Sequence, residues 1–168
     1  MSDYFNQLLA DPTSFHNAPY DEAFKLTNDQ ISQLHIEGAR KRFAELRPGI
    51  SVLDKLAREQ GVEAINTIDD IAPLLFPHTV YKSYPISYLE RSRFDRLTRW
   101  LGGLTTTDIS HVDAKDIETI DDWLDLLDAK TDLTVAHTSG TTGKLSFVPR
   151  TKAQWRQTIV HSGVIIRD

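Results

Sequence analysis

The sequence contains no cysteine among its 168 residues. This absence excludes disulfide bonds, a cysteine nucleophile and thiolate metal ligands within the chain. An excess of positive charge is also lacking, because 19 lysine and arginine residues face 24 aspartate and glutamate residues, which gives a net charge of −5. Domains that bind nucleic acid are usually basic, so this balance argues against a nucleic-acid partner.

Long apolar runs are missing as well. No segment approaches the roughly 20 apolar residues that a membrane-spanning helix needs, so we expect no membrane span. The first residues, Met1–Tyr4, do not combine a basic region with an apolar run, so we expect no signal peptide and a cytoplasmic location. With 40% hydrophobic and 26% charged residues, the composition is typical of one globular domain or a piece of one.

Apolar residues at helical spacing predict that residues 1–132 are mainly helical. We expect a short helix from Ser2 to Asp11-Pro12, a long helix that Thr27 or Asn28 caps and Pro48-Gly49 ends, and a helix over 50–61 with Gly61 just past its end. Thr67 and Thr119 each open the pattern T-I-D-D, whose spacing is that of a helix cap.

Three further segments lead to more specific expectations. Residues Ser87–Leu101 predict one amphipathic helix that Gly102-Gly103 ends, and residues 105–111 predict a strand or an extended loop. Thr151 is expected to cap a last helix whose apolar residues face inward, namely Trp155, Ile159 and Val160.

The stretch Thr138-Ser139-Gly140-Thr141-Thr142-Gly143-Lys144 stands apart from the rest. It lies between Leu133–His137 and Ser146–Pro149, which are short, mostly apolar and rich in β-branched residues, and therefore predict two strands. Glycine lets a backbone approach an anion, hydroxyl and N–H groups donate to phosphate oxygens, and Lys144 adds a positive charge. We interpret the stretch as a loop that holds the phosphates of a nucleotide; the alternative is a plain turn.

Two common nucleotide motifs are not met. In the pattern G-x-x-x-x-G-K-[ST], Thr138 stands in place of the first glycine, and Leu145 stands where a hydroxyl residue would bind magnesium. The dinucleotide pattern G-x-G-x-x-G is absent from the sequence. An ordinary P-loop ATPase and a dinucleotide-binding domain are therefore disfavoured.

The seven residues 138–144 resemble the phosphate loop of the adenylate-forming superfamily, which includes acyl-CoA synthetases, peptide-synthetase adenylation domains and luciferase. The family commonly continues with Pro and Lys, where this chain has Leu145 and Ser146. The branch of phenylacetate-CoA ligase and the bioluminescence acyl-protein synthetases often lacks that Lys. A weaker resemblance to this branch covers residues 61–85, in which Leu74–Lys82 corresponds to a Leu-Pro-Phe-like turn and a Lys; we interpret Lys82 as a surface or packing residue.

The resemblance implies an α/β fold in which a helix-rich segment, residues 1–132, leads into the strand–loop–strand–helix start of the nucleotide-binding core, residues 133–168. Such enzymes are much longer than 168 residues, so we expect this chain to be an incomplete N-terminal part of one truncated domain, without adenylation activity by itself. The implied reaction converts a small-molecule carboxylate and ATP into acyl-AMP and pyrophosphate, and a thiol such as coenzyme A then takes the acyl group.

By resemblance, the residues that hold the β- and γ-phosphates of ATP are Thr138, Ser139, Gly140, Thr141, Thr142, Gly143 and Lys144. No catalytic residue is assigned within this chain, and the ligands of the Mg²⁺ that accompanies ATP are expected outside it. His78, His111 and Asp113 are too scattered along the sequence to predict a metal site. Two other functions stay open: an acyl-protein synthetase that acylates a protein cysteine, and a non-catalytic helical interaction module.

Overall fold

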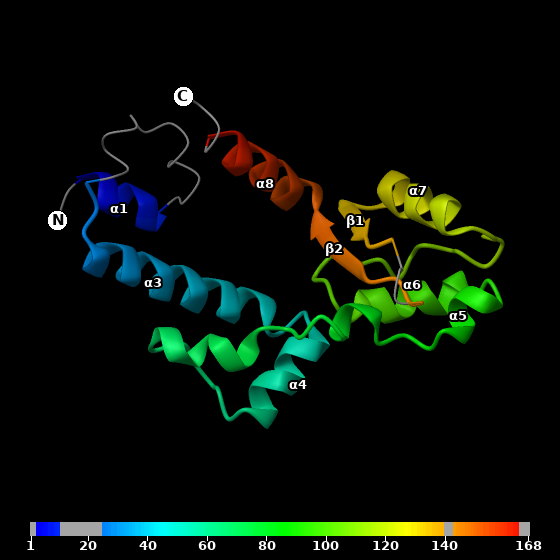
Figure 1. The fold of residues 1–168 in the computed structure, drawn as a ribbon, viewed down its shortest axis with the longest axis horizontal. Coiled ribbons are helices and arrows are strands. Elements are labelled where there is room, and N and C mark those ends of the chain that lie inside the picture. Colours follow the sequence, from blue (N-terminus) through cyan, green and yellow to red (C-terminus); the bar gives the residue numbers. More distant parts are fainter. Residues whose placement is uncertain (1–2, 11–24, 140–142, 165–168) are drawn as a thin grey trace. The chain divides into compact units, whose positions relative to one another are not determined.

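The computed structural model describes residues 3–10, 25–139 and 143–164 (Figure 1). They form a mixed fold that is rich in helix and contains one antiparallel sheet of two strands, which confirms the α/β class at this level. The chain divides into two compact units, the first drawn from residues 1–48, 53–75 and 156–168, and the second from residues 49–52 and 76–155. Within the described ranges, no helix is both long and apolar enough to cross a membrane.

Helices α1 (Asp3–Ala10) and α3 (Asn28–Leu46) contact each other in the first unit. Phe5 on α1 and Phe43 on α3 are buried, as their spacing predicts. Thr27 caps α3, because its Oγ1 accepts from the Gln30 amide at 3.3 Å while Gln30 Oε1 accepts from the Thr27 amide at 3.0 Å. The predicted cap at Ser2 and the stop at Asp11-Pro12 lie outside the described residues.

Helix α4 (Ser51–Glu59) ends as its sequence predicts. Gly61 follows it with φ +67°, a left-handed conformation that favours glycine, and the Val62 amide donates to Ala57 O at 2.9 Å to close the helix. The next two helical turns are 3₁₀ turns, η2 (Ile68–Asp70) and η3 (Ala72–Leu74). Amides of Asn66 and Thr67 donate to the Asp70 carboxylate, which lowers the pKa of Asp70 and completes the predicted cap.

The second unit contains η4 (Val80–Lys82), α5 (Ser87–Glu90), α6 (Phe94–Gly102), α7 (Ile120–Lys130), β1 (Leu133–His137) and β2 (Phe147–Thr151), and α8 (Lys152–Val164) begins in it. One hydrophobic core joins these helices to both strands. Its members are Tyr84, Phe94, Leu97, Leu101, Ile109, Val112, Ala114, Trp123, Leu127, Leu133 and Phe147. The hairpin therefore lies on a helical base, with α7 beside β1 (Figure 1).

The prediction of one helix over Ser87–Leu101 is wrong, because α5 and α6 are separate. Ser92 between them has φ +48°, a left-handed conformation in which a helix cannot continue. The Arg93 amide donates to Tyr88 O at 2.7 Å and Ser92 Oγ donates to Glu118 O at 3.3 Å, so this break is held by hydrogen bonds on both sides. Apolar residues keep their helical spacing on both sides of Ser92, so the sequence pattern does not indicate the break.

The sequence predicts either a strand or an extended loop over residues 105–111, and the structure has a loop there. Thr105 Oγ1 accepts from the Thr107 amide at 3.1 Å, and Asp108 Oδ1 accepts from the Ser110 amide at 2.9 Å. These local bonds turn the backbone and replace the partners that a strand would need. The predicted cap of the next helix is confirmed, since the Asp122 amide donates to Thr119 Oγ1 at 3.1 Å.

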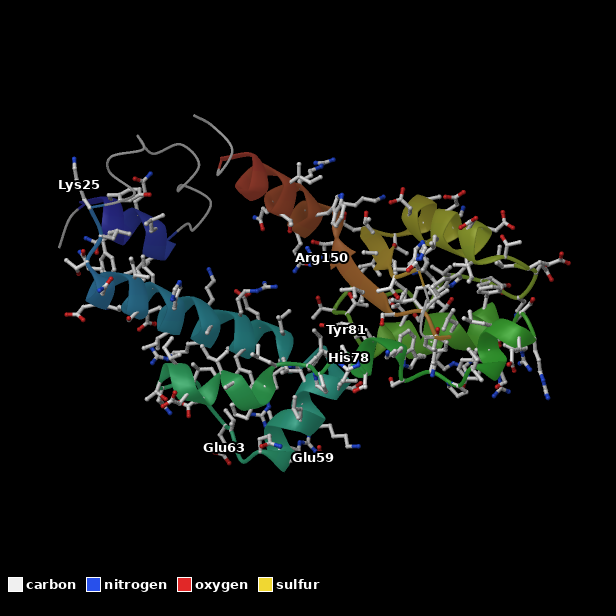
Figure 2. The ribbon with its side chains drawn as sticks, viewed as in Figure 1. Lys25, Glu59, Glu63, His78, Tyr81 and Arg150 are labelled. Carbon is white, nitrogen blue, oxygen red and sulfur yellow. The ribbon has the colours of Figure 1, made fainter. Side chains whose placement is uncertain are left out.

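Thr151 caps α8 as predicted: Gln154 N donates to Thr151 Oγ1 at 3.1 Å and Thr151 N donates to Gln154 Oε1 at 2.9 Å. The expectation that the apolar residues of this helix face inward is wrong for Trp155 and Ile159, whose exposed fractions are 37% and 57%. Trp155 lies beside the guanidinium of Arg150, which is 5.9 Å from its ring centroid and labelled in Figure 2. The side chain of Val160 lies outside the described part.

A buried polar link crosses the core of the second unit. Trp123 Nε1 donates to Thr98 Oγ1 at 2.8 Å, and Thr98 Oγ1 donates to Phe94 O at 2.8 Å. Trp123 is fully buried and Thr98 nearly so. Because the indole N–H has no access to water, it depends on the Thr98 hydroxyl as its acceptor.

We therefore predict that Thr98→Val lowers the free energy of unfolding by about 1–3 kcal/mol, since it keeps the shape of the side chain and leaves the Trp123 N–H unsatisfied. Urea denaturation measures this change. Ser83→Ala is the matched control: Trp100 Nε1 donates to Ser83 Oγ at 3.0 Å in an exposed position, where water replaces the hydroxyl. The control is expected to change stability by less than about 0.5 kcal/mol; equal losses in the two variants would contradict the buried role of Thr98.

Candidate functional site

The predicted phosphate loop is the turn of an antiparallel hairpin. Strands β1 and β2 pair from Leu133↔Thr151 to His137↔Phe147. The pairing continues for one more step, because the Thr138 amide donates to Ser146 O at 3.2 Å and the Ser146 amide donates to Thr138 Oγ1 at 3.1 Å. The first strand has the predicted bounds, and the second runs over Phe147–Thr151, one residue later than predicted at its start and two at its end. Residues 139–145 connect the two paired segments, and of these the structure describes 139 and 143–145.

Four of the seven predicted site residues are described. Thr138, Ser139 and Gly143 are exposed, and Lys144 is partly buried, while Gly140, Thr141 and Thr142 lie outside the described residues. Because Thr138 Oγ1 accepts from Ser146, its O–H remains a donor for a further acceptor. Gly143 has φ +89°, and a Cβ placed there would meet no atom within 4 Å, so its backbone conformation and not lack of space requires glycine.

The ammonium group of Lys144 lies against Tyr84. Lys144 Nζ donates to Tyr84 O and is 4.4 Å from the centroid of the Tyr84 ring. An ammonium has three N–H donors, so this carbonyl occupies one and leaves two for an anion. Burial, and to a smaller degree the positive charge of Lys82, lower the pKa of Lys144 from its ordinary value of 10.5.

Tyr84 is a site residue that sequence reasoning missed. It is fully buried, and its Oη donates to Leu145 O at 2.8 Å, which lies on the C-terminal arm of the turn. Burial raises the pKa of Tyr84, so the phenol remains the hydrogen-bond donor at neutral pH. In the sequence, Tyr84 is a single aromatic residue that directly precedes Pro85. No local pattern links it to a loop 60 residues later.

Phe147 joins the hairpin to the helices below it. Its ring is fully buried, with centroids 5.6 Å from Tyr84 and 5.2 Å from Trp123, the latter in an edge-on arrangement. Across the hairpin, the ring of His137 lies 6.3 Å from Phe147 and its Nδ1 is 3.2 Å from Thr138 O. The strand ends next to the turn are therefore held by aromatic packing, and the turn extends beyond that packing.

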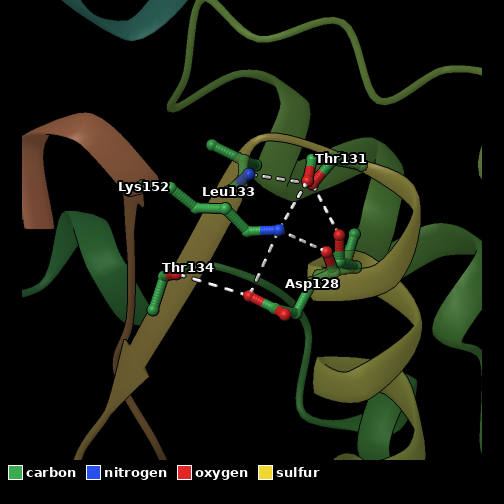
Figure 3. Close-up of polar contacts among 6 residues, drawn as sticks. Asp128, Thr131, Leu133, Thr134 and Lys152 are labelled. Carbon is green, nitrogen blue, oxygen red and sulfur yellow. Dashed lines mark hydrogen bonds and ion pairs between the residues drawn. The ribbon is translucent and has the colours of Figure 1, made fainter.

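The open end of the hairpin is fixed by Lys152, the first residue of α8 (Figure 3). Lys152 Nζ donates to Asp128 O at 2.7 Å and to Thr131 O at 3.2 Å, and lies 3.6 Å from the Asp128 carboxylate. Carbonyls in the last turn of a helix lack partners within the helix, and a cation suits the negative end of its dipole. Lys152 thus caps the C-terminus of α7 and ties the end of β2 to it.

A metal site has no support in the described residues, since no three His, Asp or Glu side chains come together there. Within the described residues, His78, His111 and Asp113 do not form such a group. The described part of the turn offers hydroxyl, amide and ammonium donors, which match phosphate oxygens and not a metal ion.

A separate cavity of about 600 Å³ lies between α6 and residues 105–115. Its lining mixes both signs of charge, including Asp95, Asp108, Arg99 and Lys115. Asp95 already accepts from Arg93 at 3.3 Å, and Asp108 accepts from the Ser110 amide at 2.9 Å. Because these carboxylates are engaged locally, the hairpin turn with Lys144 is the stronger candidate site.

Comparisons with models of protein families, with curated proteins and with solved structures found no match.

Removing the Lys152 cap is predicted to weaken the hairpin base. Lys152→Gln loses the charge-assisted bonds to Asp128 O and Thr131 O, and we expect the free energy of unfolding to fall by about 1 kcal/mol, because the side chain is partly exposed. Lys130→Gln, in the last turn of the same helix but exposed, removes the same charge and is the control, with an expected change below about 0.5 kcal/mol. Urea denaturation of both variants decides the matter, and indistinguishable midpoints would refute the cap.

The charge of Lys82 is predicted to act on Lys144. Because the pKa of Lys144 is lower in the folded chain than in the unfolded chain, the unfolded chain binds more protons between these two values, and the free energy of unfolding rises with pH across that window towards 10.5. Lys82→Gln should move the Lys144 pKa up towards 10.5, as NMR titration of the lysine side-chain amines measures. Lys130→Gln should leave it unchanged, and an unaltered Lys144 titration in Lys82→Gln would show that the two charges do not interact.

Proposed function

We propose that residues 133–151 form the phosphate-binding hairpin of an ATP-dependent, AMP-forming acyl-activating enzyme of the adenylate-forming type. The observation that carries the proposal is positional. The stretch that resembles the phosphate loop of that superfamily falls on the turn of an antiparallel hairpin, and the lysine at its end is held by Tyr84 O with two N–H donors left. A turn that gathers N–H groups, hydroxyls and an ammonium group is suited to a polyphosphate.

The proposed reaction has two halves. In the first, an oxygen of the substrate carboxylate attacks the α-phosphorus of ATP, the bond from that phosphorus to the bridging oxygen breaks, and pyrophosphate leaves with the electron pair. In the second, a thiol sulfur attacks the acyl carbon, AMP leaves, and the thiol proton is released. Negative charge grows on pyrophosphate in the first half, so donors directed at the β- and γ-phosphates stabilise its transition state.

The residues of the turn supply these donors in the proposal. The free O–H of Thr138, the amides and hydroxyls of the residues up to Thr142, and the two remaining N–H groups of Lys144 bind the phosphate oxygens. Gly143 allows the reversal that brings the backbone close to an anion. Mg²⁺ bound to ATP would offset further phosphate charge, with its protein ligands elsewhere.

The identity of the thiol divides the proposal into two forms. Leu145 and Ser146 replace the common Pro-Lys of the superfamily, which favours the branch that contains both phenylacetate-CoA ligase and the acyl-protein synthetases. The acceptor is therefore coenzyme A or the cysteine of a protein. Incubating the full-length protein with ATP and a radiolabelled carboxylate, with and without coenzyme A, distinguishes a thioester of coenzyme A from an acylated protein.

The turn hydroxyls are predicted to be required for adenylation. Thr141→Ala combined with Thr142→Ala should lower carboxylate-dependent ATP–pyrophosphate exchange by the full-length protein at least about tenfold, because donors to the departing pyrophosphate are lost. The matched control is Thr106→Ala with Thr107→Ala, two adjacent threonines in the loop after α6. Exchange should be unaffected in the control. Equal exchange in both double variants and the wild type would refute the phosphate-binding role, and a wild type that binds no nucleotide would favour the interaction module.

A further inference from the structure

Tyr84 contacts two consecutive residues of the candidate phosphate loop by different groups. Its phenol donates to Leu145 O at 2.8 Å, and its own main-chain carbonyl accepts from Lys144 Nζ. The ring lies between these contacts, 4.4 Å from the ammonium. Tyr84 thus contacts the C-terminal arm of the turn through its side chain and its backbone at once.

Tyr84 is itself held rigidly. Its side chain is fully buried, with the Trp100 ring edge-on at 4.9 Å and the Phe147 ring at 5.6 Å. Trp100 is itself partly buried and packs against the same hydrophobic core. The contacts to Lys144 and Leu145 therefore tie the C-terminal arm of the turn to the core of the second unit.

From this geometry we infer that Tyr84 is a positioning residue of the phosphate loop, which holds Leu145 and Lys144 in place before a polyphosphate binds. The inference rests on the proposed function and extends it to a residue 60 positions away from the loop. Gly143 gives the turn conformational freedom, and a ligand must overcome that freedom when it orders the loop. Fixing the adjoining two residues in advance reduces this loss and directs the ammonium towards the site.

The contact also fits the donor count of Lys144. Tyr84 O takes one N–H, and the ring face stabilises the positive charge, so the ammonium is kept in place with two donors left. Tyr84 is expected to touch no phosphate, since its hydroxyl is occupied by Leu145 O. Its effect on a ligand passes through the loop, which makes it a positioning residue.

The test compares Tyr84→Phe with Tyr88→Phe in the 168-residue chain. Tyr84→Phe removes only the hydroxyl that donates to Leu145, while the ring and the carbonyl near Lys144 remain. Tyr88 is a half-buried tyrosine of α5 that packs against the same core, so Tyr88→Phe is the matched control. Isothermal titration calorimetry with inorganic tripolyphosphate should show an affinity about fivefold to tenfold lower for Tyr84→Phe, the loss expected for one hydrogen bond, and wild-type affinity for the control.

Two readouts separate positioning from packing. In the absence of ligand, the carbonyl ¹³C resonance of Leu145 should shift in Tyr84→Phe and stay unchanged in Tyr88→Phe. 4-Aminophenylalanine at position 84 restores a donor and should recover the wild-type affinity, which a change in core packing would not do. This second variant also decides the matter if Tyr84→Phe fails to fold.

The outcomes are distinct. If the wild type binds tripolyphosphate and Tyr84→Phe binds it equally well, the positioning role is overturned while the proposed function stands. If the wild type binds no tripolyphosphate, the positioning role is overturned, while ATP–pyrophosphate exchange by the full-length protein decides the proposed function separately. Weaker binding by Tyr84→Phe with rescue by 4-aminophenylalanine supports both.

Discussion

Burial of Phe147 is the constraint on which the hairpin depends. A pair of strands with no further support is marginally stable in water, and β1 and β2 form the whole of the sheet in the described chain. Phe147 lies at the strand end next to the turn and places its ring among Tyr84 and Trp123 in the core of the second unit. An aromatic ring buried there contributes more to stability than any one hydrogen bond between the strands. It therefore fixes the position of the hairpin and determines which of its two faces packs against the core.

From that centre the hairpin is tied at both ends. Tyr84 holds the arm of the turn, and Lys152 binds the last carbonyls of α7 at the open end. The register explains why a proline is tolerated in between. Hydrogen bonds from Thr138 to Ser146 and from Lys152 to Asp132 set the bonded pairs at alternate positions, so Pro149 faces Val135 in a pair without such bonds. Its missing N–H would lie on the outer edge of β2, where no ladder bond is lost.

Features set by local chemistry could be predicted from the sequence. The caps at Thr27, Thr119 and Thr151 need a hydroxyl residue and an amide three positions later, and the stop at Gly61 needs a residue that adopts positive φ. The break at Ser92 could not be predicted, because a non-glycine residue adopts the left-handed conformation there and its hydroxyl bonds to Glu118, which is 26 residues away. Tertiary contacts of this kind override a spacing that favours one helix.

The candidate site also has features that local sequence predicts and features that depend on tertiary contacts. The composition of residues 138–144 and the strands on either side predict a turn rich in donors, and the pattern carries that information within a dozen residues. What holds the turn comes from Tyr84, which lies in the segment before α5 and contacts Leu145 and Lys144. Those contacts depend on how the core folds, so neither spacing nor propensity reveals them. In the proposed function, the loop gains specificity for an anion from a rigid support, and that support is Tyr84, a residue whose sequence context predicts only packing.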